Sequence, residues 1–252
     1  MEIKKITELK NGKYKIKLDS FEFITYDDII INHGLLYSKK IDDELLNILS
    51  LETAYYEIYN KALKFCMKKV RSNDEVEKYL DKMDISDIDK TSIINKLKSI
   101  NLINDKMYVK CYINDKYNLS AYSLSKIKED LINSNIDINI IEDEMSKVEY
   151  NEYDKLEKMI IKRIKGNHKY SNYMLKNKIV NEFINLGYKY DDIVSIFDSN
   201  SSDNYDILVK EYNKLYNKYS KKYNYSELEY VIKNKLYTKG FNYSDIKKED
   251  LN

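Results

Sequence analysis

The chain has 252 residues, with 43 lysine and arginine side chains against 42 aspartate and glutamate, 26 tyrosines, no proline and no tryptophan. This composition excludes collagen-like, low-complexity Pro/Gly-rich and disulfide-stapled proteins. An apolar fraction of 43% with a net charge of +1 also argues against disorder, which needs few apolar residues and a large net charge. We therefore expect a folded protein of one or two ordinary domains, with no proline to interrupt its helices.

The first forty residues differ from the rest of the chain because apolar side chains recur there at every second position. Tyr14, Ile16 and Leu18 alternate with charged residues, which is the pattern of a half-buried strand. Asn11 and Gly12 precede this run, and Asn-Gly between two apolar runs indicates a hairpin because both residues tolerate a positive φ. The pattern predicts a β-hairpin near the N-terminus.

A third strand and a short helix are expected directly after the hairpin. Residues Phe21–Ile24 extend the strand pattern, and Thr25 is placed to cap a helix that ends near Gly34. Residues 1–40 are therefore predicted to form a small β cap.

From about residue 41 the apolar pattern is helical, and it repeats at a long period. Four pairs of apolar residues follow one another at offsets of 51, 52 and 53 residues. The apolar residue five places after each pair keeps the same rhythm, and in the last two repeats it follows Gly187 and Gly240, which suit a left-handed helix end. The pairs are Val76 and Leu80, Ile127 and Leu131, Ile179 and Phe183, and Ile232 and Leu236. This spacing predicts tandem copies of one structural unit.

Each unit is interpreted as three helices. In the first unit, a helix over Ala54–Val70 precedes one that Ser72 caps, with Glu75 at capping-box spacing, and a third follows over Asp89–Ile100. In the last unit, the third helix over Ser244–Leu251 is short and charged, as suits a terminal capping repeat. The predicted units are residues 41–104, 105–150, 151–199 and 204–252. The predicted fold class is mainly α, with tandem three-helix repeats in an elongated, curved array behind the small N-terminal β-hairpin cap.

The near-zero net charge hides an uneven distribution. Residues 155–189 carry nine positive and two negative side chains, net +7, whereas residues 129–154 carry one lysine against nine acids, net −8. Basic side chains at helical spacing form stripes on the first helices of the third, first and fourth units. The stripes comprise Lys155, Lys158, Lys162, Lys165 and Lys169; Lys61, Lys64, Lys68 and Arg71; and Lys210, Lys214, Lys218 and Lys221.

Two interpretations of the stripes stay open. Lysines at helical spacing are often no more than the solvated face of an amphipathic helix. Their repetition on corresponding helices instead favours contact with a polyanion or with the acidic surface of a protein filament, through salt-sensitive electrostatics. The acidic block after Glu129 would repel nucleic acid locally, so a protein partner with DNA alongside fits the mixed pattern better.

The sequence has no constellation typical of catalysis, metal binding or cofactor binding. Its five glycines are scattered and form no phosphate-binding loop. His33 and His168 are isolated from other metal ligands, and Cys66 and Cys111 lie far apart in helical patterns, as reduced thiols do. We therefore expect no enzyme activity and no cofactor. The charged N-terminus and the lack of an 18-residue apolar run predict a cytoplasmic protein.

The chain resembles a known family at two motifs. Residues Ile93–Val109 are similar to the signature of the RecX family of bacterial recombination regulators, in which a helix ends in Leu-x-x-x-Gly-Leu-Ile-Asp-Asp. Residues 69–76 resemble the family's basic, Arg-Ser, Glu-Leu pattern, and the hairpin resembles the N-terminal extension of its longer Gram-positive members. Asn101 replaces the family's glycine, a mild change because asparagine tolerates a left-handed conformation. Residues 118–120 depart further, since Asn-Leu-Ser replaces the usual Lys-Gly-Pro.

The resemblance implies a regulator of the RecA recombinase, acting in DNA recombination, DNA repair and the SOS response. Such a protein would lie in the groove of the RecA–DNA filament, bridge adjacent protomers, and modulate, chiefly by inhibition, ATP hydrolysis and strand exchange. The implied partners are the RecA filament and the single- or double-stranded DNA within it, contacted by a monomer. The predicted contact residues are Lys61, Lys64, Lys68, Lys69, Arg71, Lys155, Lys158, Lys162, Arg163, Lys165, Lys169, Lys210, Lys214 and Lys218.

Two alternatives from other functional classes remain. One is a helical repeat protein that binds single-stranded nucleic acid without RecA, with tyrosines stacked on bases and lysines on phosphates. The other is a helical scaffold with no DNA role.

Overall fold

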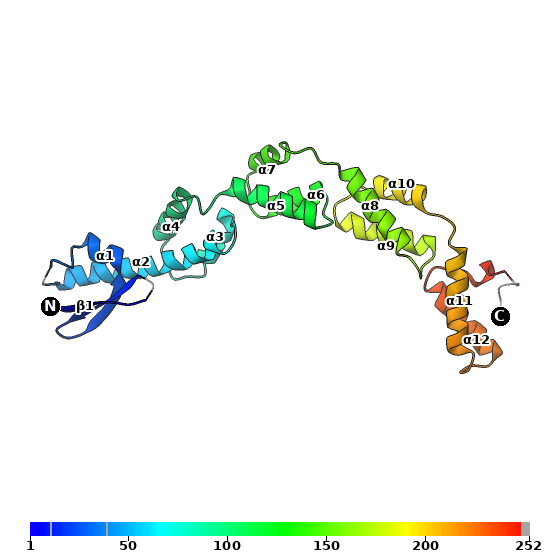
Figure 1. Cartoon of the computed structure of the whole chain (residues 1–252), viewed down its shortest axis with the longest axis horizontal. Coiled ribbons are helices and arrows are strands. Elements are labelled where there is room, and N and C mark those ends of the chain that lie inside the picture. The colour runs from blue at the N-terminus through cyan, green and yellow to red at the C-terminus, as the bar shows by residue number, and fades with distance from the viewer. Residues whose placement is uncertain (11, 39, 248–252) are drawn as a thin grey trace. The chain divides into compact units, whose positions relative to one another are not determined.

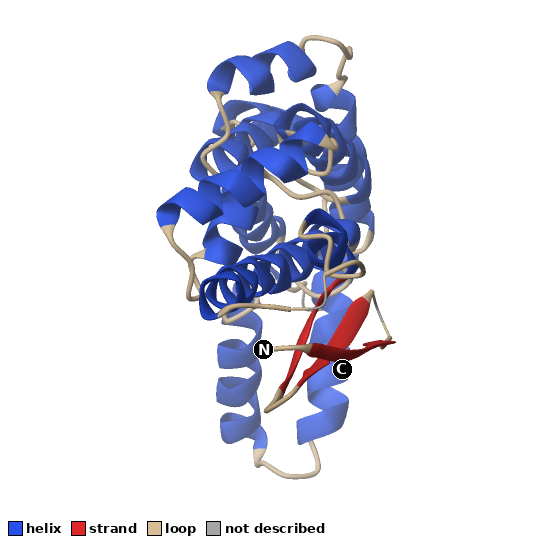
Figure 2. Ribbon diagram, turned by 90° about the vertical axis from the view of Figure 1, so that its left-hand side faces the viewer, coloured by secondary structure: helices blue, strands red, loops and turns tan. Residues whose placement is uncertain are grey.

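The N-terminal part of the protein is a three-stranded sheet, and the regular structure after it is helical (Figure 1, Figure 2). The computed structural model describes residues 1–10, 12–38 and 40–247. These residues form twelve α-helices and one sheet, which confirms a fold that is mainly α with a small N-terminal β element. The elongated, curved arrangement of the repeats stays a prediction.

The sheet confirms the strand pattern of the N-terminal residues. Ile16 and Leu18 are buried while Lys17 between them is exposed, so successive side chains point to opposite faces. Gly12 has a φ of +68°, which fits the hairpin turn, whereas Asn11 lies outside the described residues. The antiparallel strands are, in spatial order, β1 (Ile3–Glu8), β2 (Lys13–Leu18) and β3 (Glu22–Tyr26).

The short helix α1 (Asp27–Asn32) begins later than predicted. Its N-cap residue is Tyr26, and the prediction that Thr25 caps the helix is wrong. Thr25 is the fourth residue of β3, fully buried, and its Oγ1 lies 2.8 Å from Oγ1 of Thr53. The strand therefore continues to the start of the helix, and the threonine hydroxyl joins two elements instead of capping one.

The helix α2 (Asp43–Met67) begins eleven residues before the predicted start at Ala54. Asp42 caps its N-terminus by accepting a hydrogen bond from the backbone N–H of Leu45 (2.8 Å). The first turns bury Leu49 among the side chains of the sheet, and the last turns bury Cys66 in a different apolar cluster. One helix thus contributes to the apolar clusters of both the sheet and the first group of helices, and the predicted boundary at residue 40 stays a prediction.

Three further clusters of buried apolar side chains lie among the helices. One cluster draws on α2, α3 and α4, a second on α8, α9 and α10, and a third on α11, α12 and the turn that follows. Division of the chain at the predicted residue boundaries stays a prediction. The bounds are α3 (Asn73–Leu80), α4 (Asp87–Ser99), α5 (Asp105–Leu119), α6 (Leu124–Asn133), α7 (Ile138–Met145), α8 (Glu152–Lys165), α9 (Asn172–Asn185), α10 (Tyr190–Asn200), α11 (Tyr205–Tyr219) and α12 (Tyr225–Tyr237).

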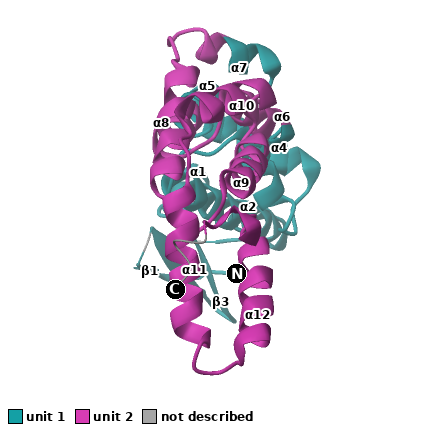
Figure 3. Ribbon diagram, turned by 90° about the vertical axis from the view of Figure 1, so that its right-hand side faces the viewer, with its two compact units in different colours: residues 1–111, 133–142 teal, residues 112–132, 143–252 magenta. Residues whose placement is uncertain are grey.

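The chain divides into two compact units (Figure 3). The first comprises Met1–Cys111 and Asn133–Glu142 and contains the sheet cluster and the cluster of α2, α3 and α4. The second comprises Tyr112–Ile132 and the residues from Asp143 onward and contains the other two clusters.

The period near 52 residues marks positions in the core. All eight members of the four apolar pairs are at most 2% exposed, and the pairs lie on α3, α6, α9 and α12. Gly187 and Gly240 have φ values of +88° and +82°, as predicted for helix ends, and Asn135 occupies the equivalent place with +55°. What recurs every 52 residues or so is therefore one buried helix together with the left-handed turn that ends it.

The last repeat ends differently from the prediction. The described residues contain a single 3₁₀ turn, Tyr243–Asp245, after which Ile246 is extended and buried. Residues 248–252, which the predicted final helix includes, lie outside the described part of the chain.

Candidate interaction surface

On α2 and in the residues just after it, the predicted basic side chains divide into exposed and packed ones. The helix ends at Met67 with Lys68 as its C-cap, so the prediction that Arg71 shares the face of this helix is wrong. Lys61, Lys64 and Lys68 are exposed and form no ion pair within the described residues. The Arg71 guanidinium instead lies 3.9 Å above the ring of Phe65 and 3.6 Å from the Glu75 carboxylate. Its side chain is only 15% exposed, so Arg71 packs the end of this helix group and offers little of its charge to a partner.

On α8 the exposed stripe is shorter than predicted. Lys158, Lys162 and Lys165 are exposed and unpaired among the described residues. The helix ends at Lys165 with Gly166 as its C-cap, so the prediction that Lys169 shares the face of this helix is wrong. Lys169 lies in the following loop, 5.1 Å from the ring of Tyr170.

Lys155, the first residue of that stripe, is held inside the fold. Its Nζ donates to the carbonyl oxygens of Tyr117 (2.6 Å) and Tyr122 (2.9 Å) and lies 4.3 Å from the Tyr117 ring. Burial lowers the pKa of the Lys155 amine, although Glu152 opposes this effect. The cation holds the end of α5 and the loop that leads to α6, the region in which residues 118–120 depart from the resembled family.

Arg163 is also engaged within the fold. Its Nε lies 3.2 and 3.1 Å from the two carboxylate oxygens of Glu182, across from α8 on α9. These hydrogen bonds raise the pKa of the guanidinium, and the bidentate geometry fixes its plane. Part of the Arg163 charge is thus neutralised by Glu182, although half of the side chain is exposed.

On α11, Lys210 and Lys218 are exposed and free of ion pairs among the described residues, and Lys214 lies 3.6 Å from Glu211. Glu211 is buried and also pairs with Lys239, which lies in the turn after α12. Lys69, the remaining predicted contact, lies 3.1 Å from Glu75. Of the predicted contact residues, those that are exposed and form no ion pair within the described part of the chain are Lys61, Lys64, Lys68, Lys158, Lys162, Lys165, Lys169, Lys210 and Lys218.

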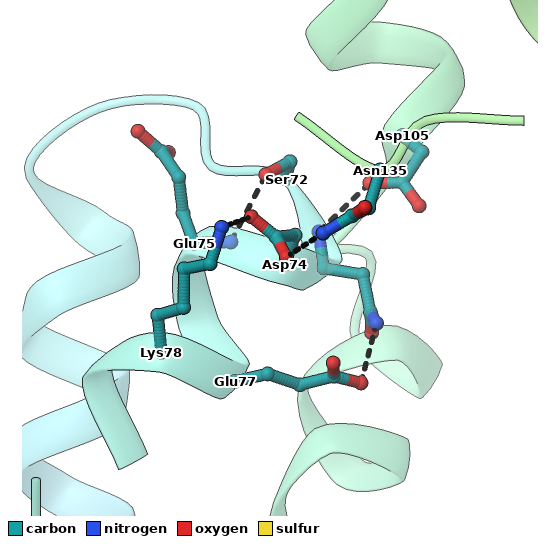
Figure 4. A network of polar contacts seen from close by, with 8 residues as sticks. Ser72, Asp74, Glu75, Glu77, Lys78, Asp105 and Asn135 are labelled. Atoms are coloured by element: carbon teal, nitrogen blue, oxygen red, sulfur yellow. Dashed lines mark hydrogen bonds and ion pairs between the residues drawn. The ribbon is translucent and has the colours of Figure 1, made fainter. Parts of the chain in front are cut away.

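The two motifs that resemble the RecX family meet in space (Figure 4). Arg71 and Ile103 form a parallel backbone bridge, and the backbone N–H of Asn73 donates to the Asp105 carboxylate (2.8 Å). Ser72 is buried and caps α3 by accepting from the N–H of Glu75 (3.1 Å), as predicted. The Glu75 carboxylate pairs with Lys69 and Arg71 and does not complete the predicted capping box. These motif residues join α3 to the start of α5, which gives them a structural role.

A neighbouring turn adds to this set of contacts between α3 and the start of α5, which we call a joint. The side chain of Asn135 donates to Asp74 (2.6 Å), and Lys78 donates to the other oxygen of that carboxylate (2.6 Å) (Figure 4). Burial raises the pKa of Asp74, but the hydrogen bonds from Lys78 and Asn135 outweigh this effect and lower it overall. Asn101, at φ +61°, takes the left-handed conformation that its replacement of the family's glycine requires.

The same joint recurs in the next repeat. The buried N-cap Ser123 is followed by Leu124, whose N–H donates to the Glu152 carboxylate (2.6 Å), as Asn73 does to Asp105. The N–H of Ser123 donates to the carbonyl of Leu186 (2.9 Å), just before the left-handed Gly187. The carboxylates of Asp105 and Glu152 accept these backbone hydrogen bonds, a role that the sequence patterns did not predict. Both are acids at the first position of a helix.

A third copy keeps the backbone hydrogen bond. Ser171, which caps α9, donates its N–H to the carbonyl of Lys239 (2.9 Å), just before Gly240. A Cβ on Gly187 would lie 2.8 Å from Lys126 Cβ, and one on Gly240 would lie 2.8 Å from Met174 Cβ. Glycine is therefore needed at both joints for the close approach as well as for the positive φ.

Comparison with known proteins places these motifs in a family. No protein-family model matches the chain. A regulatory protein RecX of Streptococcus gordonii is 30% identical over 252 residues, covering 96% of both chains. The chain belongs to the RecX family. A second RecX, of Streptococcus agalactiae, is 31% identical over 260 residues, covering 96% of this chain and 97% of its own.

A solved structure supports the RecX fold. The crystal structure of a regulatory protein RecX superposes with a TM-score of 0.63 at 20% identity, covering 78% of this chain and 98% of that one. At this identity the likeness concerns the fold alone. In the described part of this RecX-family chain, no three His, Cys, Asp or Glu side chains gather as a metal site would require. None of its described helices has both the length and the hydropathy of a membrane span.

Alkaline pH is expected to destabilise this RecX-family protein. Burial raises the pKa of several tyrosine hydroxyls, most of all that of Tyr188, so the folded state keeps these protons above pH ~10, where unfolded tyrosines lose them. Stability therefore falls as pH rises through that range, and Lys155, whose pKa is lowered, opposes this only in part. The tyrosines are Tyr56, Tyr59, Tyr108, Tyr117, Tyr150, Tyr188, Tyr212 and Tyr243.

Parallel titrations of phenolate absorbance and helical circular dichroism measure this effect. The tyrosines whose pKa is raised by burial are expected to ionise only when the helices unfold and circular dichroism falls. Ionisation of all tyrosines near their ordinary pKa with helicity intact would contradict the prediction.

Proposed function

We propose that this protein regulates a RecA recombinase by binding along the groove of the RecA–DNA filament, where it inhibits ATP hydrolysis and strand exchange. It acts as a monomer in the cytoplasm, in recombination, DNA repair and the SOS response. The role needs no catalytic group and no cofactor, and the regulatory relatives of the chain support a non-enzymatic protein.

One observation carries the proposal. Exposed lysines free of ion pairs within the described residues lie on α2, α8 and α11, and each of these helices directly precedes a helix that bears a repeated apolar pair. The flexible ammonium groups of these lysines suit a partner with many regularly placed negative charges. The attraction between the lysines and such a partner is long-ranged and salt-dependent. A RecA–DNA filament offers such a surface.

The DNA-dependent ATPase of RecA from the same organism tests the proposal. Addition of the protein below one molecule per RecA protomer is expected to lower the ATPase rate, because a bound protein that bridges protomers affects several of them. An unchanged rate at excess protein would contradict the proposed function.

The contact surface is tested by the triple variant K158E/K162E/K165E, which keeps the internally bound Lys155. We expect affinity for the RecA–DNA filament to fall about tenfold or more at low salt, with a smaller difference at high salt, because three attractive charges become repulsive. The measurement is filament pull-down or anisotropy at two salt concentrations, with helicity checked by circular dichroism.

The matched control K82E/K98E/K189E makes the same change in net charge at exposed lysines outside the predicted contact set. It should keep most of the affinity. Equal losses in both variants would mean that net charge, and not this face of α8, governs binding.

A further inference from the structure

Exposed tyrosines concentrate on α12 and the turn before it. Among the described residues, eight tyrosines are prominently exposed, and four of them lie between residues 223 and 237. Their exposed fractions are 41% for Tyr223, 84% for Tyr225, 68% for Tyr230 and 78% for Tyr237. The high number of tyrosines in the chain does not by itself explain the exposure of four rings on one helical hairpin.

Two of these rings share one side of the helix. α12 packs against α11 through Leu228, Ile232 and Leu236, which are buried (Figure 1, Figure 3). Tyr230 and Tyr237 are seven residues apart, two helical turns, so they point away from that interface in the same direction at a rise of about 10 Å. The exposed Asn234 lies between them.

Exposed lysines lie at the end of α11, in the turn after it and on α12 itself. Lys218, Lys221, Lys222 and Lys235 are exposed and form no ion pair within the described residues. Both acids of α12 are engaged: Glu227 closes a capping box with Asn224, and Glu229 pairs with Lys233 (2.8 Å).

Ring contacts connect the lysine side of α11 with the tyrosines. The Nζ of Lys218 lies 5.3 Å from the ring of Tyr219, and that ring lies 6.0 Å from the ring of Tyr223. The lysine at the end of α11 is thus followed by two neighbouring tyrosine rings that lead towards α12.

This combination distinguishes a nucleic acid from an apolar protein partner. From residue 205 to 247, every large apolar side chain that is prominently exposed is a tyrosine, and none is aliphatic. A face for an apolar protein segment would expose leucine, isoleucine or methionine as well. Flat rings beside unpaired lysines are the arrangement that holds single-stranded nucleic acid, with bases on the rings and phosphates at the ammonium groups.

We infer that α12 is a base-stacking face for single-stranded nucleic acid, with Tyr230 and Tyr237 stacking on bases and the lysines around residues 218–222 and 235 neutralising phosphates. In the cell this inference rests on the proposed function, because the single-stranded nucleic acid that α12 would contact is the DNA of the RecA filament. Binding itself needs no RecA, so the two proposals fail separately.

Two labelled DNA probes of equal charge separate base stacking from electrostatic attraction. One is a 12-nucleotide oligothymidine, and the other is a 12-nucleotide abasic strand that has the same phosphates but no bases. Fluorescence anisotropy with the full chain is expected to show at least about fivefold tighter binding of oligothymidine. In Y230A/Y237A this preference should disappear, while binding of the abasic strand stays unchanged. Y230F/Y237F should keep the preference because the rings remain.

The matched control is Y173A/Y190A, which removes two exposed tyrosines from α9 and α10. It should keep the preference for bases. The inference is overturned if the wild-type protein binds both strands equally, if it binds neither, or if Y230A/Y237A retains the preference with its helicity intact. Inhibition of the RecA ATPase, measured separately, reports on the proposed function.

Discussion

Phe183→Ala is expected to lower the free energy of unfolding by about 4 kcal/mol, the largest effect of any single substitution considered for this protein. Phe183 is 1% exposed in the cluster of α8, α9 and α10, and its ring meets that of Tyr188 edge-on at 5.8 Å and 69°. Truncation removes this burial and leaves a cavity that close-packed neighbours fill only in part. Urea unfolding followed by circular dichroism and tyrosine fluorescence measures the loss.

Ile184→Ala, at the next residue of α9, provides the control. Ile184 is 44% exposed, so its truncation should cost less than about 1 kcal/mol. Similar losses for both variants would mean that the repeated apolar pair does not mark the core.

Gly187→Ala is expected to lower the free energy of unfolding by about 3 kcal/mol. Part of the cost is the φ of +88°, which L-residues avoid. The rest is a collision, because the new Cβ would lie 2.8 Å from Lys126 Cβ and 3.0 Å from its backbone nitrogen. The start of α6 cannot move away without losing the hydrogen bond from Ser123 to Leu186 (2.9 Å).

Gly34→Ala separates strain from collision. Gly34 also has a positive φ, +61°, but a Cβ there would meet nothing within 4 Å. Its substitution should cost about 1 kcal/mol, the strain alone. Gly240→Ala, at the equivalent joint with Ser171 and Met174, should behave like Gly187→Ala. A cost at Gly187 no greater than at Gly34, measured by the same urea titration, would contradict the role of close approach at the joint.

The joints explain why the family motifs are spread along the chain. Ser72, Asp105 and the turn at Asn135 come from three separate segments, yet they make one set of contacts. The copy built from Ser123, Glu152 and Gly187 uses the same backbone groups. Motif residues of this kind stabilise the contacts between helices at each joint, and we expect a partner to be contacted by exposed side chains elsewhere.

Local patterns were enough to predict several elements. The alternation around Ile16 predicted the second strand, because a sheet with one buried face needs a period of two. The repeated pairs such as Ile179 and Phe183 predicted core positions, because residues four apart share one face of a helix. Ser72 predicted a helix start, because its hydroxyl satisfies a backbone N–H that the helix leaves unpaired.

Predictions failed where a distant element decides the outcome. The start of α2 at Asp43 depends on the sheet that covers Leu49, and the position of Thr25 in β3 depends on its partner strand and on Thr53. Neither partner is visible within a window of a few residues.

The sequence by itself determined a mainly helical protein with a β element at its N-terminus, a repeat near 52 residues, and the family to which the chain belongs, because periodicity, capping and motif order are properties of neighbouring residues. Only the tertiary structure decided which basic side chains are free. Lys155, Arg163 and Arg71 have the same charge as Lys158 and Lys162, but carbonyls, a carboxylate and an aromatic ring from other elements engage the first three. A charge seen in sequence says nothing of its partner, because that partner is brought to it by the fold.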